Sequence, residues 1–464
     1  MQEHTQLSDK EITDDLLSPV IRSPKWFWMT IGSLGLIMLL GLSGYVWELY
    51  SGLGVTNVKR PVYWGAYITN FVFWIGISHA GIMVSAILRL TQAEWRRSIT
   101  RAAEVLTLFS LIAALSNILF HVGRPWRIYW ITPLPPVVIG YDFARGIWPN
   151  IRSPFVWDPV AVGTYLLSTI LFIYTCLLPD IALVRDKVKS KIPKIIYSVL
   201  ALGFRGTPRQ WKIQATAPIL LSALVLPIFV SVHSIVSWDF AVSIAVEGWH
   251  STIFAPYFII GAIHSGVSAV ACLMAGLLWL YKLDKYIKPD HFDAIGRLLV
   301  IVATIWLFTL FLEWIFALYP LEDPEIALRN MQVFQSPWNY LFILFLFTAY
   351  IIPVSAWLFK NIRRSAKWMF FTTILVNVGM WLERFLIIIP GLSRRTELSF
   401  NWGSYSPSLV EMGLVAFTFA FVICGILVFA RIFPIIPPFD VKEGMRFRHV
   451  IKIGKRNISA VVRE

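Results

Sequence analysis

Cysteine is scarce in this sequence, with only three residues in 464. Cys176, Cys272 and Cys424 each lie alone inside an apolar run, and none belongs to a CxxC or CxxCH motif. Iron–sulfur ligation and c-type haem attachment therefore have no local support. We expect the cysteines to be inert core residues, and we expect this chain to hold no bound haem, iron–sulfur cluster or other metal.

Charge is also scarce, at 15% of residues, whereas 57% are hydrophobic and the mean hydropathy is +0.66. Soluble domains are usually 45 to 50% apolar, so this composition predicts membrane integration. Ten runs are long enough to cross about 30 Å of hydrocarbon as helices. They cover residues 26–48, 64–90, 101–121, 157–183, 214–236, 253–282, 293–319, 337–361, 366–390 and 406–432. We therefore predict an all-α polytopic membrane protein with ten transmembrane helices and both termini on one side.

Lysine and arginine are depleted from one set of connecting loops. The segments on the side of the termini carry 31 of them, the opposite loops carry 9, and Arg384 lies within a helix. Because short cytoplasmic loops carry the positive excess, we predict cytoplasmic termini and a location in the bacterial inner membrane. The net charge of +14 comes largely from that inner face. It favours contacts with anionic lipid headgroups and argues against a nucleic-acid partner.

Two similar motifs suggest an internal repeat. Ile-Ser-His-Ala-Gly ends at Gly81 in the second helix, and Ile-His-Ser-Gly ends at Gly266 in the sixth. If the motifs correspond, helices 2–5 and 6–9 form two four-helix bundles, with helices 1 and 10 as additions. A chance resemblance between apolar helices is the alternative. The repeat divides the chain into an arm (1–25), a first helix with its loop (26–63), two bundles (64–236 and 253–390), a tenth helix (406–432) and a basic tail (433–464).

The histidines in these motifs, His79 and His264, allow two interpretations. The adjacent small residues permit close helix approach, and a buried imidazole can bond a neighbouring helix. The alternative is a bis-histidine haem, which needs the two rings at matched depth. Helical rise places His79 about 22 Å and His264 about 16 Å from the outer ends of their helices, so the match is poor.

The segment from Phe120 to Asp158 contains the strongest candidate site. His121 ends one helix, where Gly123 suits a left-handed cap and Pro125 prevents continuation. Asp158 and the following proline resemble an N-cap and a first helical residue. Capping alone would explain Asp158. However, a histidine and a carboxylate at the same membrane face are also the two groups that accept protons from a lipid-borne hydroquinone.

The loop between these helices is rich in aromatic residues. It contains Trp126, Trp130, Trp148 and Trp157 together with several prolines. The loop is suited to fold over a flat aromatic ligand. An interfacial aromatic belt is the alternative interpretation.

Most other intramembrane ionisable residues fall in the outer half. Beside His79, the candidates for a proton path or for buried pairing are His233, His264, Glu313, Glu383, Arg384 and Glu411. Buried charges are costly, so we expect Arg384 to pair with Glu313 or Glu411. Pairing that merely locks the helices is the alternative to a proton path. The inner half has little beyond Glu104 and Asp180.

Together these segments resemble a known family, the NrfD/PsrC-like membrane subunits, and within it most the quinol-oxidising subunit ActC of alternative complex III. The resemblance covers nearly the whole chain. It rests on Trp64-Gly65 with Phe73 to Gly81, His121 to Trp126, Ser153 to Asp158, and the Asn-Val-Gly-Met-Trp-Leu-Glu-Arg-Phe run from Asn377. It implies ten helices, two four-helix bundles and a quinone site near the periplasmic face.

The resemblance also implies partners and roles. It implies quinol as substrate, menaquinol in particular, and no redox centre in this chain. It implies electron delivery to a periplasmic iron–sulfur subunit and c-type cytochrome subunits, beside a paralogous membrane subunit. It assigns the quinol site to His121 and Asp158, with Arg124 and Arg127 nearby, and proton translocation is proposed for the family.

Two other classes of function remain open from the residues alone. A secondary transporter also combines two parallel bundles with intramembrane charges, although it needs a site accessible from both faces. A structural membrane anchor without a quinone site is the third possibility. Purification with or without quinone and partners separates the three.

Overall fold

The computed structural model describes residues 7–127, 154–393, 403–446, 448–453 and 456–461. Ten helical spans in this part of the chain are long and apolar enough to cross a membrane, which confirms the predicted class and number. They are α2 (Lys25–Ser51), α3 (Ala66–Leu90), α4 (Thr100–His121), α6 (Pro154–Lys187), α8 (Pro208–Trp238), α9 (Phe254–Tyr281), α10 (Pro289–Leu318), α12 (Trp338–Leu346), α15 (Ala366–Ser393) and α16 (Leu409–Ile432). The span of α8 continues through a π-helical turn, η5 (Asp239–Ile244), and that of α12 continues through η6 (Phe347–Ile351) into α13 (Ile352–Trp357).

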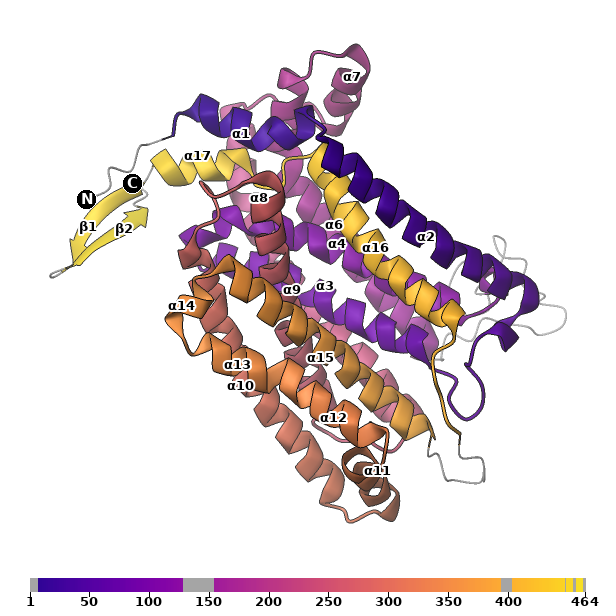
Figure 1. The fold of residues 1–464 in the computed structure, drawn as a ribbon. Coiled ribbons are helices and arrows are strands. Elements are labelled where there is room, and N and C mark those ends of the chain that lie inside the picture. The colour runs from indigo at the N-terminus through magenta and orange to yellow at the C-terminus, as the bar shows by residue number, and fades with distance from the viewer. Residues whose placement is uncertain (1–6, 128–153, 394–402, 447, 454–455, 462–464) are drawn as a thin grey trace.

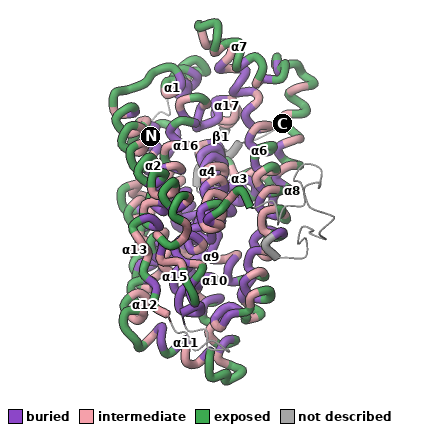
Figure 2. The backbone as a smooth tube through the Cα atoms, turned by 90° about the vertical axis from the view of Figure 1, so that its right-hand side faces the viewer, coloured by how far each residue is buried: buried purple, intermediate pink, exposed green. Residues whose placement is uncertain are grey.

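The spans pack in two groups. Helix α3 contacts α4 and α8, and α6 contacts both of these. Helix α9 packs on α10 and α15, which in turn contact the α12–α13 span. The groups meet where α3 crosses α9, while α2 and α16 pair beside the first group, as Figure 1 shows. This arrangement agrees with two four-helix bundles and two additional helices. Figure 2 shows that α3 is largely buried and that α2 and α7 are largely exposed.

The crossing of α3 and α9 depends on glycine. A Cβ atom at Gly266 would lie 2.2 Å from the Cβ of Ala80, and one at Gly81 would lie 2.4 Å from the carbonyl oxygen of Ala103 on α4. Real Cβ atoms do not approach so closely, so the small residues in the two histidine motifs set the distance between these helices, as the sequence predicts.

The two motif histidines face different helices. His79 stacks on Tyr165, with ring centroids 4.8 Å apart, and meets His233 edge-on at 4.7 Å. His264 stacks on Trp306, and its Nε2 lies 3.0 Å from the carbonyl oxygen of Ala349. Each imidazole therefore packs within its own bundle, so the two rings do not share the arrangement that a bis-histidine haem requires.

Both termini lie at one face of the bundle, here called the terminal face (Figure 1). The short helices α1 (Asp9–Ile21), α7 (Lys191–Leu200), α14 (Lys360–Arg363) and α17 (Pro438–Arg446) lie there with η2 (Glu94–Ser98), and the chain ends in the antiparallel strands β1 (Arg448–Ile453) and β2 (Arg456–Val461). The opposite face carries η1 (Leu53–Val55) and α11 (Asp323–Phe334). Ion pairs from Asp14 to Lys187 and from Asp15 to Lys285 hold α1 against the connecting segments of the terminal face.

The charge asymmetry predicts which side of the membrane each face meets. We expect a cysteine at exposed Ala245, on the opposite face, to react with an impermeant maleimide from the periplasm. A cysteine at exposed Lys189, on the terminal face, should react only after the membrane is opened. Both substitutions are made in a variant from which the three native cysteines have been removed, so that only the introduced cysteine reacts. Labelling of position 189 in sealed cells would reverse the assigned faces.

Candidate functional site

His121 is the last residue of α4, at the opposite face. The helix stops there as predicted, because Gly123 adopts a positive φ of 65° and Pro125 follows. A Cβ at Gly123 would lie 2.8 Å from Leu53, so the turn is also packed against η1. The imidazole is half-buried, and its Nδ1 has no hydrogen-bond partner among the described residues. A ring nitrogen held in this way is available to a ligand.

Asp158 is not the cap that the sequence suggests. Helix α6 begins at Pro154, so Asp158 lies in its second turn and Pro159 lies inside the helix. The N-cap interpretation is therefore wrong, and the Asp158 carboxyl group does not cap the helix. Its Oδ1 is buried without a partner in the described chain.

Asp158 instead faces a second carboxyl group, that of Asp239. The two carboxyl groups lie next to each other where α6 meets η5, whose first residue is Asp239. Two carboxyl groups in such contact can share one proton, with one group as donor and the other as acceptor. Oδ2 of Asp239, like Oδ1 of Asp158, is buried without a described partner. Sequence reasoning missed Asp239, whose only signal is a carboxylate directly after the fifth predicted helix.

An aromatic wall adjoins Asp239. Trp64 stacks on Trp249, with centroids 5.6 Å apart and planes 17° apart, and meets Phe240 edge-on at 5.0 Å. Trp64 belongs to the first motif of the family resemblance and packs on Phe240, the residue after Asp239. Phe240 and Trp249 are buried, so the partly exposed Trp64 is the ring of this cluster that could contact an aromatic ligand.

The remaining predicted members of the site are peripheral in the described structure. Arg124 and Arg127 are exposed, and the backbone N–H of Arg127 donates to the carbonyl of Arg124 at 2.9 Å. Trp126 and Trp157 are also exposed, by 58% and 56%, as expected for residues of an interfacial belt. Trp130 and Trp148 lie outside the described residues. Helices α4 and α6 pack together, so His121 and Asp158 share one end of neighbouring helices.

The predicted partners of Arg384 are wrong. Its guanidinium lies 3.2 Å from Glu383 and stacks over Phe258 at 4.6 Å. Glu313 instead lies 3.5 Å from Arg329 of α11. Glu411 closes the capping box of α16 with Ser408 and accepts a hydrogen bond from the hydroxyl of Tyr405.

Two other predicted residues of the outer half also have structural partners. Glu383 accepts hydrogen bonds from the Tyr257 hydroxyl and, at 3.0 Å, from the Trp306 indole. Nε2 of His233 lies 2.9 Å from the carbonyl oxygen of Phe258. These bonds agree with the helix-locking interpretation of Glu383 and His233, and their place on a proton path stays a prediction.

Helix α2 carries an unexpected carboxylate. Glu48 is fully buried and accepts a hydrogen bond of 2.6 Å from Tyr67 of α3. Tyr67 also packs on Phe120, the residue before His121. The first helix therefore contributes a buried acid close to the end of α4.

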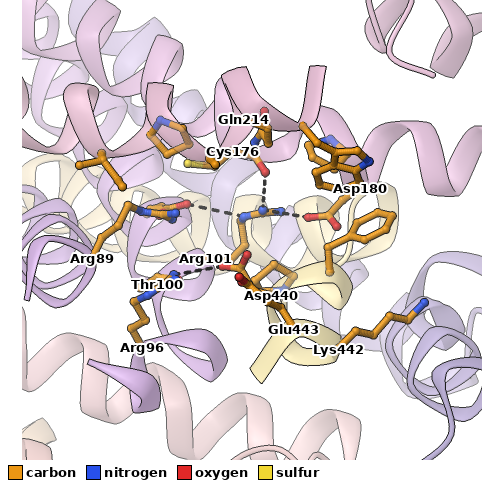
Figure 3. Close-up of a pocket in the computed structure, with 18 of the residues that line it drawn as sticks. Arg89, Arg96, Thr100, Arg101, Cys176, Asp180, Gln214, Asp440, Lys442 and Glu443 are labelled. Carbon is orange, nitrogen blue, oxygen red and sulfur yellow. Dashed lines mark hydrogen bonds and ion pairs between the residues drawn. The ribbon is translucent and has the colours of Figure 1, made fainter. Parts of the chain in front are cut away.

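The terminal face holds a larger charged cavity, shown in Figure 3, of about 750 Å³. Arg101, almost fully buried, donates to Asp180 at 2.9 Å, and Ser85 donates to Glu104 at 2.5 Å. Glu104 and Asp180 were expected in this half, but the buried arginines around them were not. Oε2 of Glu104 and Oδ1 of Asp180 lack hydrogen-bond partners among the described side chains.

Helix α17 borders this cavity through an anchored carboxylate. Arg96 donates to the Asp440 side chain at 3.2 Å (Figure 3). Arg97 donates to the Asp440 carbonyl at 2.6 Å. Burial alone would raise the pKa of Asp440, but Arg96 and the neighbouring arginines hold that pKa below its usual value. Asp440 is therefore ionised at neutral pH and holds α17 against η2.

Comparison with known proteins places the chain among membrane subunits of oxidoreductases. The family model "Polysulphide reductase, NrfD" matches residues 54–394. The chain is 27% identical over 271 residues to a putative dimethyl sulfoxide reductase membrane subunit of Halobacterium salinarum, a match that covers 58% of this chain and 55% of that relative. It thus spans little more than half the length of that protein.

Two further relatives match over almost their full length. A selenate reductase subunit of Mesobacillus selenatarsenatis is 22% identical over 435 residues, which cover 90% of this chain and 95% of the relative. The Hdr-like menaquinol oxidoreductase integral membrane subunit of Archaeoglobus fulgidus is 22% identical over 423 residues, which cover 86% of this chain and 92% of the relative. The family match begins after α2 and leaves out α16, so it contains the eight spans of the two bundles.

Proposed function

Because this chain belongs to the NrfD family of membrane subunits, we propose that it oxidises quinol at the opposite face, near His121 and Asp158. In this proposal it is the integral membrane subunit of a respiratory or photosynthetic electron-transfer complex in a bacterial inner membrane. The opposite face is periplasmic and both termini are cytoplasmic. Arg124 and Arg127 border the entrance to the site.

The main support is the contact between the Asp158 and Asp239 carboxyl groups, each of which has a buried oxygen that accepts no hydrogen bond from the described residues. Such atoms are costly to bury unless something binds them. The unpartnered Nδ1 of His121 at the end of the adjacent helix supports the same conclusion. Together these groups offer two places for a proton, one on the imidazole and one on the carboxyl pair.

Quinol oxidation needs two such places. A hydroquinone that becomes a quinone loses two electrons and its two hydroxyl protons. One proton passes to His121 and the other to the pair formed by Asp158 and Asp239, which act as general bases. The two electrons pass to an iron–sulfur cluster of a periplasmic partner protein. In this proposal the partly exposed ring of Trp64, which packs on Phe240, supports the quinol ring.

The names of the relatives support the substrate and the assembly. The Archaeoglobus fulgidus relative is a menaquinol oxidoreductase subunit, so menaquinol is the proposed substrate. The other two are subunits of reductases, which supports an assembly of several different chains. Its proposed members are the iron–sulfur subunit, c-type cytochrome subunits and a paralogous membrane subunit, as in alternative complex III.

Proton translocation is the finer part of the proposal. Glu104 and Asp180 line the cavity at the terminal face, each with an oxygen that makes no hydrogen bond to the described residues, and in this proposal the cavity opens to the cytoplasmic side. Near mid-depth, His79 and His233 form an edge-on pair between this cavity and the quinol site. These groups are the candidates for proton uptake and transfer.

Purification from native membranes tests the proposed function. We expect the chain to co-purify with a quinone and with redox subunits, and the complex to reduce an acceptor in a quinol-dependent way. Redox partners without bound quinone and without quinol oxidation would indicate a structural anchor. A chain that purifies alone and moves a solute across vesicles would indicate a secondary transporter.

A further inference from the structure

An apolar groove lies on the outer surface between α10 and α12, near the opposite face. Leu310, Phe311, Trp314, Ile315 and Tyr319 of α10 line it with Phe342 of α12. Its volume is about 560 Å³, and Phe311 is 61% exposed. In the membrane this surface meets the lipid chains, so lipid-soluble molecules reach the groove directly.

A small polar pocket lies directly behind this groove. Leu310, Trp314 and Phe342 line both spaces, so the groove and the pocket adjoin at these three side chains. The pocket has a volume of about 30 Å³ and is lined by Glu313 and Arg329. That volume holds a group of the size of one water molecule, such as a single hydroxyl or carbonyl oxygen.

The pocket contains polar atoms that need a partner. Arg329 is only 9% exposed, yet its Nε and Nη2 make no hydrogen bond in the described chain. Oε1 of Glu313 also makes none, because it lies 3.5 Å from Arg329. The other Glu313 oxygen accepts a hydrogen bond from Ser251, which fixes the carboxyl group. The ion pair between Arg329 and Glu313 therefore leaves hydrogen-bonding capacity on both side chains at the back of an apolar groove.

We propose that the groove and the polar pocket bind a second lipid-borne quinone or quinol, with one ring oxygen in the pocket beside the ion pair of Glu313 and Arg329. The ring lies against Trp314 and Phe342, and the isoprenoid tail follows the groove into the lipid. A quinol hydroxyl donates to Glu313, and a quinone carbonyl accepts from Arg329. The inference rests on the proposed function, since it assumes that this chain handles lipid-borne quinones.

The charges around the pocket favour a neutral ligand. Three carboxylates, those of Glu313, Glu325 and Glu383, surround two guanidinium groups, those of Arg329 and Arg384. An anionic phospholipid headgroup would meet a net negative charge there, whereas a quinone or quinol is uncharged.

The location matches that of the first site. In each bundle the polar cluster lies towards the opposite face, at the end of the second helix of the bundle. His121 ends α4, and Glu313 lies in the last two turns of α10. Both clusters contain buried carboxyl oxygens without a partner in the described residues. A repeated four-helix unit would place two related sites in this way.

Photoaffinity labelling tests the second site. The complex is placed in nanodiscs, illuminated with an azido-menaquinone below saturation, and digested for peptide mapping. We expect label both near α4 and α6 and near α10 and α12. Glu313→Gln keeps the shape of the side chain but removes a charged acceptor, so labelling of the second region should fall about tenfold. Leu310→Trp adds bulk where the groove and the pocket adjoin, and it should have a similar effect.

Ile301→Trp is the matched control, because it adds the same bulk to a lipid-facing position of α10 outside the groove. It should leave both labels unchanged. Label confined to the first region in the wild type, or second-region label that Glu313→Gln and Leu310→Trp leave intact, would overturn the second site alone. Absence of label from both regions would overturn the proposed function as well.

Discussion

Asp158→Asn is expected to lower quinol oxidation at least about tenfold, equivalent to roughly 1.4 kcal/mol of transition-state stabilisation, while the complex assembles normally. The amide has nearly the shape of the carboxyl group and still hydrogen-bonds to Asp239. It cannot accept a proton at neutral pH, so one of the two proton acceptors is lost. Since α6 begins four residues earlier, the helix does not depend on Asp158 as a cap.

The measurement is quinol-dependent reduction of an acceptor by the purified complex, and the set of proteins that co-purify is the test of assembly. Asp186→Asn is the matched control, because Asp186 lies on the same helix at the terminal face, where it is exposed and pairs with Arg185. It should keep full activity. Wild-type turnover in a well-assembled Asp158→Asn complex would remove Asp158 from the site.

Variants of His121 and Asp239 test whether these residues act with Asp158 as one catalytic unit. His121→Phe keeps a ring but loses the base, so its activity should fall to a similar degree. Asp239→Asn should do the same, because it replaces the other half of the carboxyl pair. If His121 and Asp158 act together, the double variant should be hardly worse than the worse single variant, since effects within a catalytic unit do not add.

Hydrophobic runs predicted the ten spans because crossing a membrane requires length and apolarity, which are local properties. The start of α6 was less predictable. Pro154 and Pro159 both suit a first helical position, and the structure uses Pro154. The sequence alone does not rank two such signals five residues apart.

The sequence did not predict which charged residues pair between helices, and the reason is physical. Which charges meet depends on how each helix is rotated about its axis, and no local pattern fixes that rotation. Asp239 lies 81 positions from Asp158 and meets it only through the packing of α6 on α8. The misassignment of Glu411 was avoidable, because Ser408-Leu-Val-Glu is a capping box and such a glutamate serves its own helix.

The close crossing of α3 and α9 leads to the second large effect, a loss of stability in Gly266→Ala. The added methyl group would lie 2.2 Å from the Cβ of Ala80 and 2.9 Å from the carbonyl oxygen of Ile77. Neither atom is the end of a flexible side chain, so the helices must separate. Overpacking of this kind costs about 1–3 kcal/mol or more. Because the crossing joins the two bundles, we also expect weaker quinol oxidation.

Gly276→Ala on the same helix is the control, because nothing lies within 4 Å of the added Cβ. Alanine is the better helix former by about 1 kcal/mol, so this variant should match or exceed the wild type in stability. Thermal unfolding of the purified complex in detergent measures both. Ala80→Gly removes the methyl group that Gly266→Ala would strike, and it should restore part of the lost stability in the double variant. A Gly266→Ala protein as stable as the Gly276→Ala control would mean that the helices do not cross at this point.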